Sequence, residues 1–191
     1  PQSKLQVAGG IQMADDTDTA SADKVGTMRY RTGTEYVEVT GTELITNGDF
    51  ATDTDWTKGT GTTISGGAAN FSSADAVSLY QNIGTQTGYV KVEFTVTSYT
   101  SGILNVYSGS NQSVGNVNVS ANALGTYTAY VDRNGGNVNI IFGSSSTSNF
   151  TGSIDNVSVI EVTEEDASYA DMCMQTGAST YEWVNIVRNT Y

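Results

Sequence analysis

The side chains in this sequence that could do chemistry are mainly tyrosines, amides and carboxylates. The 191 residues include 11 tyrosines and 20 acidic residues, but no histidine and a single cysteine, Cys173. Without histidine, Ser-His-Asp triads and most zinc sites are excluded. A tyrosine ring offers a flat apolar face, and amides beside it can hydrogen-bond hydroxyl groups. Side chains of these types could contact a hydroxyl-rich ring such as a sugar.

Some of these residues fall where strand alternation predicts outward-facing side chains. In residues 102–107, Leu104 and Val106 are expected to face inward, so Tyr107 faces outward. We expect a glycan site in which Tyr107 shares one outward sheet face with another tyrosine, Tyr80 or Tyr130. The predicted glycan-binding residues are Tyr80, Asn105, Tyr107, Tyr130 and Asn139. The alternative is that they are ordinary exposed strand residues without a ligand.

Strands must position these residues, because the composition is that of an all-β chain. Gly, Ser, Thr and Asn are abundant, and short alternating runs follow one another from residue 43 onward. Runs of this kind, separated by turns at regular spacing, are typical of a sandwich or barrel. The clearest is 89–96, in which alternate residues are apolar. The predicted core includes Leu79, Val92, Phe94, Leu104, Val106, Ile140 and Phe142.

The residue pattern at the two ends of the chain differs from the short alternating runs of the central part. Residues 25–31 and 35–39 are predicted strands, joined by a turn at Thr32-Gly33-Thr34. The acidic run at 15–18 is predicted to be a solvated loop, since no complete cation-loop pattern follows it.

Beyond the central part, an acidic hinge is predicted at residues 163–166. Strands are predicted at 168–175 and 180–187, with a turn between them. Cys173 is expected to be a buried thiol, because a lone cysteine cannot form an intrachain disulfide. These changes in residue pattern divide the chain into three parts: 1–38, 39–163 and 164–191.

The overall charge excludes some partners. Eight basic and 20 acidic residues give a net charge of −12, which repels polyphosphates and anionic lipid surfaces. We therefore expect no nucleic-acid binding. No apolar run approaches the roughly 20 residues that span a bilayer, so we expect no membrane insertion. The chain begins at Pro1, so we expect it to be a fragment or processed product of a longer protein.

Two motifs mark the ends of the central part. It opens with Glu43-Leu44-Ile45-Thr46-Asn47-Gly48-Asp49-Phe50 followed by Trp56, and closes with Gly152-Ser153-Ile154-Asp155-Asn156-Val157-Ser158-Val159. With alternating strands between them, these motifs resemble the jelly-roll carbohydrate-binding modules of families four, nine and twenty-two. The resemblance covers roughly 120 residues. It implies a jelly-roll β-sandwich, with Trp56 in the core.

The same resemblance implies a structural calcium ion, since the first and last strands of a jelly roll meet. The implied ligands are Glu43, Asn47, Asp49 and Asp155, which offer the oxygen atoms that Ca²⁺ prefers. Ala51 stands where the family often has an acid, so one possible ligand is missing. The alternative is that Asn47-Gly48 is an ordinary turn and that Asp155 accepts hydrogen bonds from backbone amides.

The flanks carry a second resemblance, which is seen when residues 39–166 are left out and the two remaining parts are read as one sequence. Lys24-Val25-Gly26-Thr27-Met28-Arg29-Tyr30-Arg31-Thr32-Gly33 then leads into Tyr169-Ala170-Asp171-Met172-Cys173-Met174-Gln175-Thr176-Gly177, and further to Trp183-Val184. The joined sequence resembles the C-terminal tip of bacteriophage tail fibres, especially of marine phages. Residues 5–11 resemble the fibre shaft entering the tip.

The tail-fibre resemblance implies a homotrimer. It agrees with a physical argument, since roughly 65 residues in short pieces cannot bury a core alone. The residues expected to be buried between chains are Met28, Met172, Met174, Trp183 and Ile186. The alternative is a monomer in which the flanks pack as an extra layer on the jelly roll.

Together these features predict a virion tail fibre or appendage protein that is extracellular and not an enzyme. It would attach to host cell-surface glycans and contact other tail proteins. Alternatives are a cellular adhesin or an ancillary carbohydrate-binding module of a larger secreted protein. A glycan depolymerase fragment would need two convergent carboxylates. The acids here cluster in loops and in the predicted hinge instead.

Overall fold

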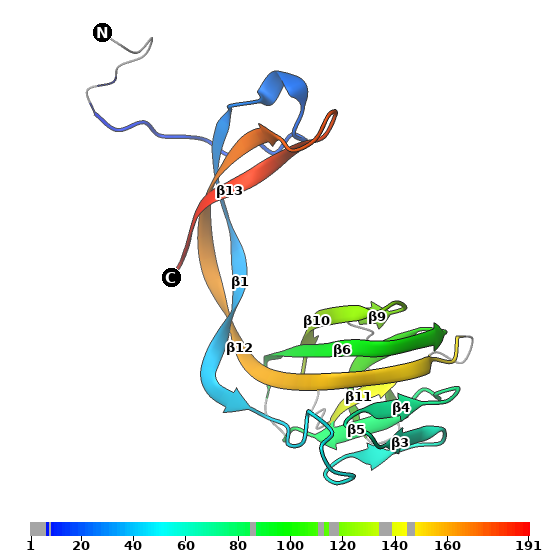
Figure 1. The fold of residues 1–191 in the computed structure, drawn as a ribbon. Helices are drawn as coiled ribbons and strands as arrows, with labels where there is room; N and C mark the ends of the chain where they lie inside the picture. Colours follow the sequence, from blue (N-terminus) through cyan, green and yellow to red (C-terminus); the bar gives the residue numbers. More distant parts are fainter. Residues whose placement is uncertain are drawn as a thin grey trace. The chain divides into compact units, whose positions relative to one another are not determined.

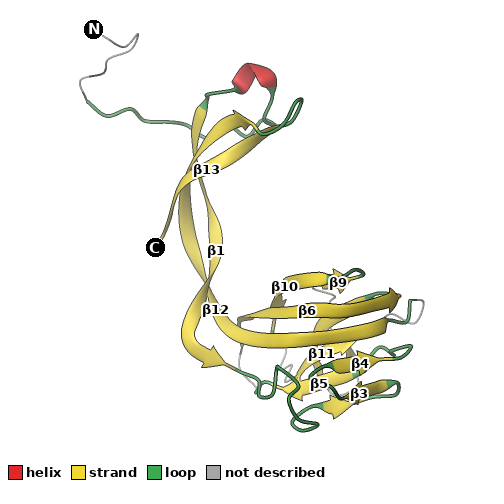
Figure 2. Ribbon diagram, in the orientation of Figure 1, coloured by secondary structure: helices red, strands yellow, loops and turns green. Residues whose placement is uncertain are grey.

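The computed structural model describes residues 7, 9–84, 87–110, 113–114, 119–133, 139–144 and 148–191. The regular secondary structure of these residues consists of antiparallel strands and one short 3-10 helix, η1 (Ala22–Lys24) (Figure 2). The all-β prediction is therefore confirmed. The strands are β1 (Met28–Glu43), β2 (Thr57–Lys58), β3 (Thr62–Ile64), β4 (Ala69–Phe71), β5 (Leu79–Asn82), β6 (Tyr89–Ser101), β7 (Leu104–Ser110), β8 (Ser113–Val114), β9 (Val119–Ala121), β10 (Gly125–Asp132), β11 (Asn139–Gly143), β12 (Thr151–Gln175) and β13 (Tyr181–Thr190).

The chain divides into two compact units. Residues 37–163 form one, here called the sandwich unit, and residues 1–36 with 164–191 form the other, here called the ribbon unit. Strands β1 and β12 each contribute residues to both units. The flanking strands are therefore long and continuous, where the sequence pattern predicted short ones.

Two predicted breaks in these strands are wrong. The turn predicted at Thr32-Gly33-Thr34 and the hinge predicted at 163–166 both lie inside continuous strands, β1 and β12. Gly33 does not break β1: a β-carbon there would lie 3.4 Å from the Tyr169 ring, an ordinary van der Waals distance, and the backbone stays extended.

The sandwich unit consists of two antiparallel sheets with a shared core (Figure 1). Among the described residues, the first sheet has the order β10-β6-β12-β4-β3, and the second has β2-β5-β11-β7-β8 with β9 also on β7. All seven predicted core residues are fully buried between them, which confirms the alternation. Each such side chain contributes roughly 1.5–3 kcal/mol on burial, so the sandwich unit has its own source of stability.

The ribbon unit has one polar face that is covered. Its sheet is made by β1, β12 and β13, which wind together in Figure 1. On the covered face, Asp171 is 1% exposed and bonds Arg29 and Arg31 of β1. The segment before η1 lies over this face: Arg29 donates to the Asp16 carbonyl oxygen, and the Trp183 indole donates to that of Asp18.

The opposite face of the ribbon sheet is apolar and open. Strand alternation places Met28 and Tyr30 on the side of β1 that faces away from Asp171. Cross-strand pairing places Met172 beside Val184 and Ala170 beside Val187 on the same side. The open face is defined here as Met28, Tyr30, Met172, Met174, Val184 and Val187. Met28, Tyr30, Met174 and Val187 are exposed, and the other two are half-buried.

The hydrophobic core cluster of the described chain lies in the sandwich unit, between residues 44 and 159. In the ribbon unit the buried residues are alternate positions of β12: Ala167, Tyr169, Asp171 and Cys173. The expectation of a buried Cys173 thiol is confirmed, and its Sγ lies 3.6 Å from the Ser21 carbonyl oxygen. The ribbon unit thus has a buried cluster around Asp171 on one face and exposed apolar side chains on the opposite face.

Candidate functional site

The outward face of the second sheet gathers most of the predicted glycan-binding residues. Inward positions of β5, β11 and β7 are filled by core residues, so their neighbours face away from the core. The register places Ile141 of β11 between Tyr80 of β5 and Tyr107 of β7. Asn139 and Asn105 lie on the same face by alternation. Four of the five predicted residues therefore share one sheet face.

The fifth predicted residue, Tyr130, lies elsewhere. It belongs to β10 in the first sheet, where it pairs with Lys91 of β6. The expectation that Tyr130 could share a face with Tyr107 is therefore wrong. Alternation predicts which side of a strand a residue occupies, but it does not say which of two sheets the strand joins.

Tyr107 itself is covered. It is 4% exposed, and its hydroxyl accepts a hydrogen bond from the Asn105 amide at 3.0 Å. The Asn105 oxygen accepts one from the Ser120 hydroxyl at 2.8 Å, and Asn139 is 1% exposed. Tyr107 and Asn105 thus form part of a buried polar network. As they lie, they cannot offer an open ring face to a sugar, which corrects the role predicted for them.

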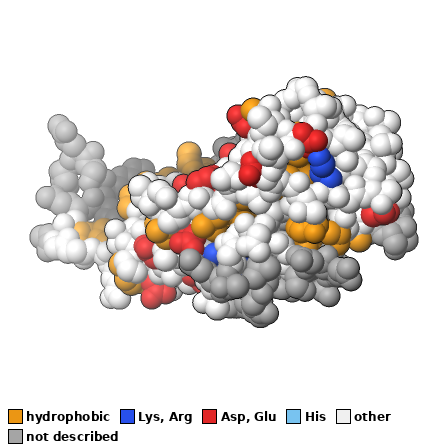
Figure 3. All heavy atoms as spheres, turned by 90° about the horizontal axis from the view of Figure 1, so that it is seen from below, with side chains coloured by type: hydrophobic (Ala, Val, Ile, Leu, Met, Phe, Trp, Pro, Cys, Tyr) orange, Lys and Arg blue, Asp and Glu red, His pale blue; other side chains and the backbone are white. Residues whose placement is uncertain are grey.

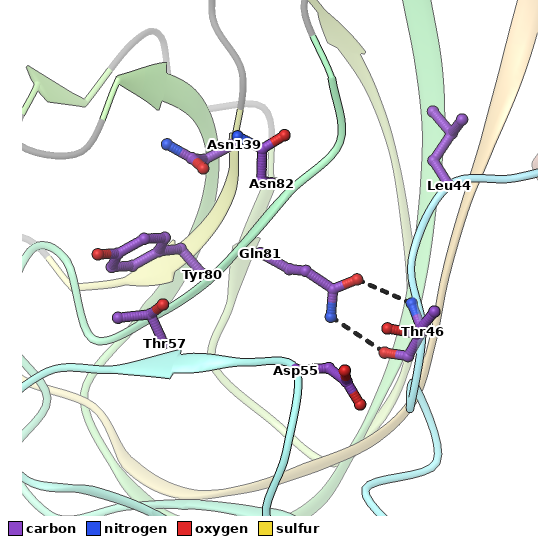
Figure 4. A pocket seen from close by; sticks show the side chains of 8 residues that line it. All are labelled: Leu44, Thr46, Asp55, Thr57, Tyr80, Gln81, Asn82 and Asn139. Carbon is purple, nitrogen blue, oxygen red and sulfur yellow. Dashed lines mark hydrogen bonds between the residues drawn. The ribbon is translucent and has the colours of Figure 1, made fainter.

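Tyr80 is the predicted tyrosine that lines a pocket. A pocket of about 520 Å³ lies beside it, at the edge of the second sheet (Figure 4). The pocket is lined by Leu44, Thr46, Asp55, Thr57, Tyr80, Gln81, Asn82 and Asn139. Two of the predicted site residues, Tyr80 and Asn139, therefore meet at one cavity. Sequence reasoning did not select the other six.

Strand pairing explains how the wall of the pocket is built. Thr57 of β2 pairs with Tyr80 of β5, and Asn82 of β5 pairs with Asn139 of β11. Directly paired residues project to the same side of a sheet, so the wall presents a ring and hydroxyl next to two amides. Figure 4 shows Tyr80 beside Thr57, and Asn82 beside Asn139. Since β2 is only two residues long, Thr57 gave no alternating signal in the sequence.

A glutamine clamp fixes the opposite side of the pocket. The Gln81 side-chain oxygen accepts from the Thr46 amide at 2.8 Å, and its nitrogen donates to the Thr46 carbonyl at 3.0 Å. Figure 4 shows both bonds as dashed lines. These two hydrogen bonds have the pattern of a backbone pair between neighbouring strands, and they attach the segment that follows β1 to β5. The clamp holds Leu44 and Thr46 at the pocket edge.

Trp56 anchors the acidic residue of the pocket. The expectation that Trp56 is a core residue is confirmed: it is 6% exposed and packs against Phe50 and Phe142, with ring centroids 5.4 and 6.1 Å away. Its indole donates to the Asn47 carbonyl at 3.0 Å. Asp55, just before it, has a left-handed backbone with φ 68°, which is unusual for a non-glycine residue. The anchored ring thus fixes Asp55 at the pocket.

The pocket keeps unused hydrogen-bonding groups. Within the part of the chain that the structure describes, the Tyr80 and Thr57 hydroxyls and the Asn82 side-chain nitrogen have no hydrogen-bond partner. The Asn82 oxygen accepts from the Gly84 amide at 2.9 Å, which orients the amide group. A tyrosine ring with free donors around it is suited to a polyhydroxylated ligand.

The residues predicted to bind calcium lie where the two ends of the sandwich meet. The Leu44 amide bonds the Val159 carbonyl at 2.8 Å, and the Val157 amide bonds the Gly48 carbonyl at 2.8 Å. A β-carbon at Gly48 would overlap the Val157 carbonyl oxygen, so only glycine fits this crossing. The opening and closing motifs of the sandwich are therefore in direct contact.

The oxygens of these four residues already accept hydrogen bonds from the protein. Glu43 accepts from the Ser158 hydroxyl at 2.6 Å and the Val159 amide at 2.8 Å. The others accept from backbone amides: Asn47 from Thr52, Asp49 from Ala51 and Asp155 from Asn156. Among the described residues, no three Asp, Glu, His or Cys side chains converge as a metal site would require. The arrangement fits a hydrogen-bonded seam, and calcium binding stays a prediction.

Glu43→Ala tests this seam. Because hydrogen bonds to a carboxylate are strong but Glu43 is exposed, we expect the unfolding free energy of the sandwich unit to fall by about 1.5 kcal/mol. Thermal melting, with calcium and with a chelator, should show the same loss in both conditions. If calcium instead raises the melting temperature of the wild type and not of Asp155→Ala, the seam does bind the metal.

Comparison with protein-family models and with curated proteins finds no match to this chain. Among the described residues, no helix is long and apolar enough to cross a membrane.

Proposed function

We propose that this chain is a non-enzymatic attachment protein of a virion, a tail fibre or appendage, in which the sandwich unit binds a host-surface glycan and the ribbon unit joins three copies. The observation that carries the proposal is the contrast between the two units. One has a complete core and an open polar pocket, and the other has an open apolar face. In this proposal, the sandwich unit binds the ligand and the ribbon unit carries out the assembly.

The pocket supports the glycan-binding part of the proposal. Tyr80 supplies an aromatic wall, while Thr57, Asn82 and Asp55 supply donors and acceptors for hydroxyl groups. Its eight lining residues include one carboxylic acid, Asp55. Glycoside hydrolysis in most families needs a pair of carboxyl groups across the bond. The lining therefore favours binding over cleavage.

The open face supports the assembly part of the proposal. Of the twelve large hydrophobic residues exposed in the described chain, nine lie in the ribbon unit. A second pocket, of about 310 Å³, is lined by Ile11, Gln12, Met13 and Tyr30 next to this face. Four of the nine, Met28, Tyr30, Met174 and Val187, lie on the open face, and exposed apolar patches mark protein interfaces. The number three, the jelly-roll topology and the virion location come from the resemblances of the sequence.

One residue expected in the trimer interface lies on the other face. Trp183 pairs with Cys173 and lies under the Arg29 guanidinium, 4.3 Å from the ring centroid, so it belongs to the covered face. Met28, Met172 and Met174 are on the open face. The pairing of β12 with β13 shifts register between Ala170 and Asp171, so Ile186 has no paired residue on β12. Its side chain is 49% exposed. The proposed interface therefore uses Val184 and Val187 in place of Trp183.

Tyr80→Ala tests glycan binding directly. Because the ring forms the aromatic wall of the pocket, we expect its removal to weaken binding on a glycan array by roughly ten-fold or more, as for a central contact residue. Tyr130→Ala is the matched control, since Tyr130 is 41% exposed on the other sheet. A wild-type protein that binds no glycan, or a Tyr80→Ala variant that binds normally, would contradict the proposed site.

A further inference from the structure

The charge of the pocket restricts which sugars it can accept. Among its eight lining residues, Asp55 carries the only formal charge, and neither Lys nor Arg is present. The whole chain has a net charge of −12. Figure 3, which shows one face of the molecule, has acidic side chains at several places and basic ones at few. An anionic ligand would therefore enter a negative field without a local cation to receive it.

Asp55 is not neutralised by its neighbours. Its Oδ2 accepts from the Thr54 hydroxyl at 2.7 Å. In the described residues, the nearby cation Lys58 forms its ion pair with Asp53, and no ion pair involves Asp55. The anchored Trp56 fixes the position of Asp55, as described above. The carboxylate is thus held at the pocket with one oxygen open to a ligand.

We propose, as an extension of the glycan-binding function, that the pocket takes a sugar with a free ammonium group, a deacetylated amino sugar. The ammonium donates a charge-assisted hydrogen bond to Asp55, while Tyr80, Thr57 and Asn82 contact the ring and its hydroxyls. Asp55 is exposed, so the charge pair adds a modest amount: roughly two- to five-fold in affinity, as for other exposed pairs. Acidic sugars are disfavoured by the same carboxylate.

The test compares three matched oligosaccharides on the full chain by calorimetry at about pH 6, where amines are protonated. The probes are oligomers of glucosamine, of glucose and of galacturonate, which differ in charge. We expect glucosamine oligomers to bind roughly two- to five-fold more tightly than glucose oligomers, and galacturonate to bind weakest. The preference should shrink when salt is added, since exposed charges are screened.

Asp55→Asn should abolish the preference for glucosamine oligomers over glucose oligomers. Asp53→Asn is the control, because Asp53 pairs with Lys58 outside the pocket lining and its removal should keep the preference. Equal binding of the glucosamine and glucose oligomers by the wild type, or a preference that persists in Asp55→Asn, would overturn this inference alone. If none of the three probes binds and the glycan array is also blank, the proposed function itself fails.

Discussion

Asp171→Asn is expected to unfold the ribbon unit while the sandwich unit stays folded. Asp171 is 1% exposed and accepts from Arg31 at 2.7 Å, Arg29 at 3.0 Å and Asn185 at 3.0 Å. Removing one partner of a buried charge cluster costs roughly 3–5 kcal/mol, because the remaining charges lose their compensation. Among the described residues of the ribbon unit, only three apolar side chains are buried, Ala167, Tyr169 and Cys173, so little packing offsets such a loss.

Aromatic rings extend the effect of Asp171 through the unit. Arg29 lies 4.3 Å from the Trp183 ring centroid, and Arg31 lies 3.6 Å from that of Tyr169. The carboxylate holds both guanidinium groups in place over these rings. Without it, the two stacked pairs would lose their alignment together with the ion pairs, so the destabilisation should extend across β1, β12 and β13.

Hydrogen exchange read by mass spectrometry can separate the two units. In Asp171→Asn, amides of β13 should exchange rapidly, while those of β6 and β11 stay protected. Asp166→Asn is the matched control, because Asp166 is an exposed carboxylate on the same strand. Protection of β13 equal to the wild type in Asp171→Asn would show that the polar cluster contributes little.

The same carboxylate gives the ribbon unit a defined response to acid. Burial by itself raises the pKa of Asp171, but hydrogen bonds from Asn185, Arg31 and Arg29 outweigh it and lower the pKa below 3.8. A carboxyl whose pKa is lowered by folding stabilises the fold above its unfolded value. That contribution should be fully present at neutral pH and be lost as the pH falls below 3.8 through the folded pKa.

The sequence allowed the core of the sandwich unit to be predicted, because each inward residue is specified by local alternation. Val92 and Phe94 alternate with polar residues, and both are fully buried. The contact between the opening and closing motifs was also expected, from the resemblance of the central part. Gly48 is what permits this contact. These features depend on residues that are close in sequence or on motifs that are specific.

The candidate pocket could be predicted only in part, because it depends on pairings between distant segments. Tyr80 was selected as outward-facing, but Thr57 reaches it through a strand of two residues. Asp55 reaches the pocket because Trp56 is anchored in the core. Tyr107 obeys the alternation and is nevertheless buried, since facing away from the core does not guarantee exposure to solvent.

The ribbon unit shows a different limit of sequence reasoning. Arg29, Arg31 and Asp171 lie on strands that are about 140 residues apart in sequence. Charged residues are mostly found exposed, and alternation alone does not say which face of a strand is covered. In the ribbon unit, the face that carries these charges is covered and the opposite, apolar face is open.

Val187→Glu is expected to separate the assembly into single chains. Val187 is 59% exposed on the open face, so a glutamate there remains hydrated in one chain and costs little. In an assembly that covers this face, the same carboxylate would be buried without a partner, which costs several kcal/mol. Leu124→Glu is the control, since Leu124 is 66% exposed, belongs to the sandwich unit and is not part of the open face.

Light scattering measures the outcome. The wild type and Leu124→Glu should have about three times the chain mass of 20.1 kDa at micromolar concentration, and Val187→Glu should have the mass of one chain. Loss of the trimer should also weaken binding to a multivalent glycan surface, by roughly 10²-fold or more, because linked pockets bind at high effective concentration. Binding of a single short oligosaccharide should be unchanged, since the pocket lies within the sandwich unit. A wild-type monomer, or a Val187→Glu variant of unchanged mass, would refute the assembly through the open face.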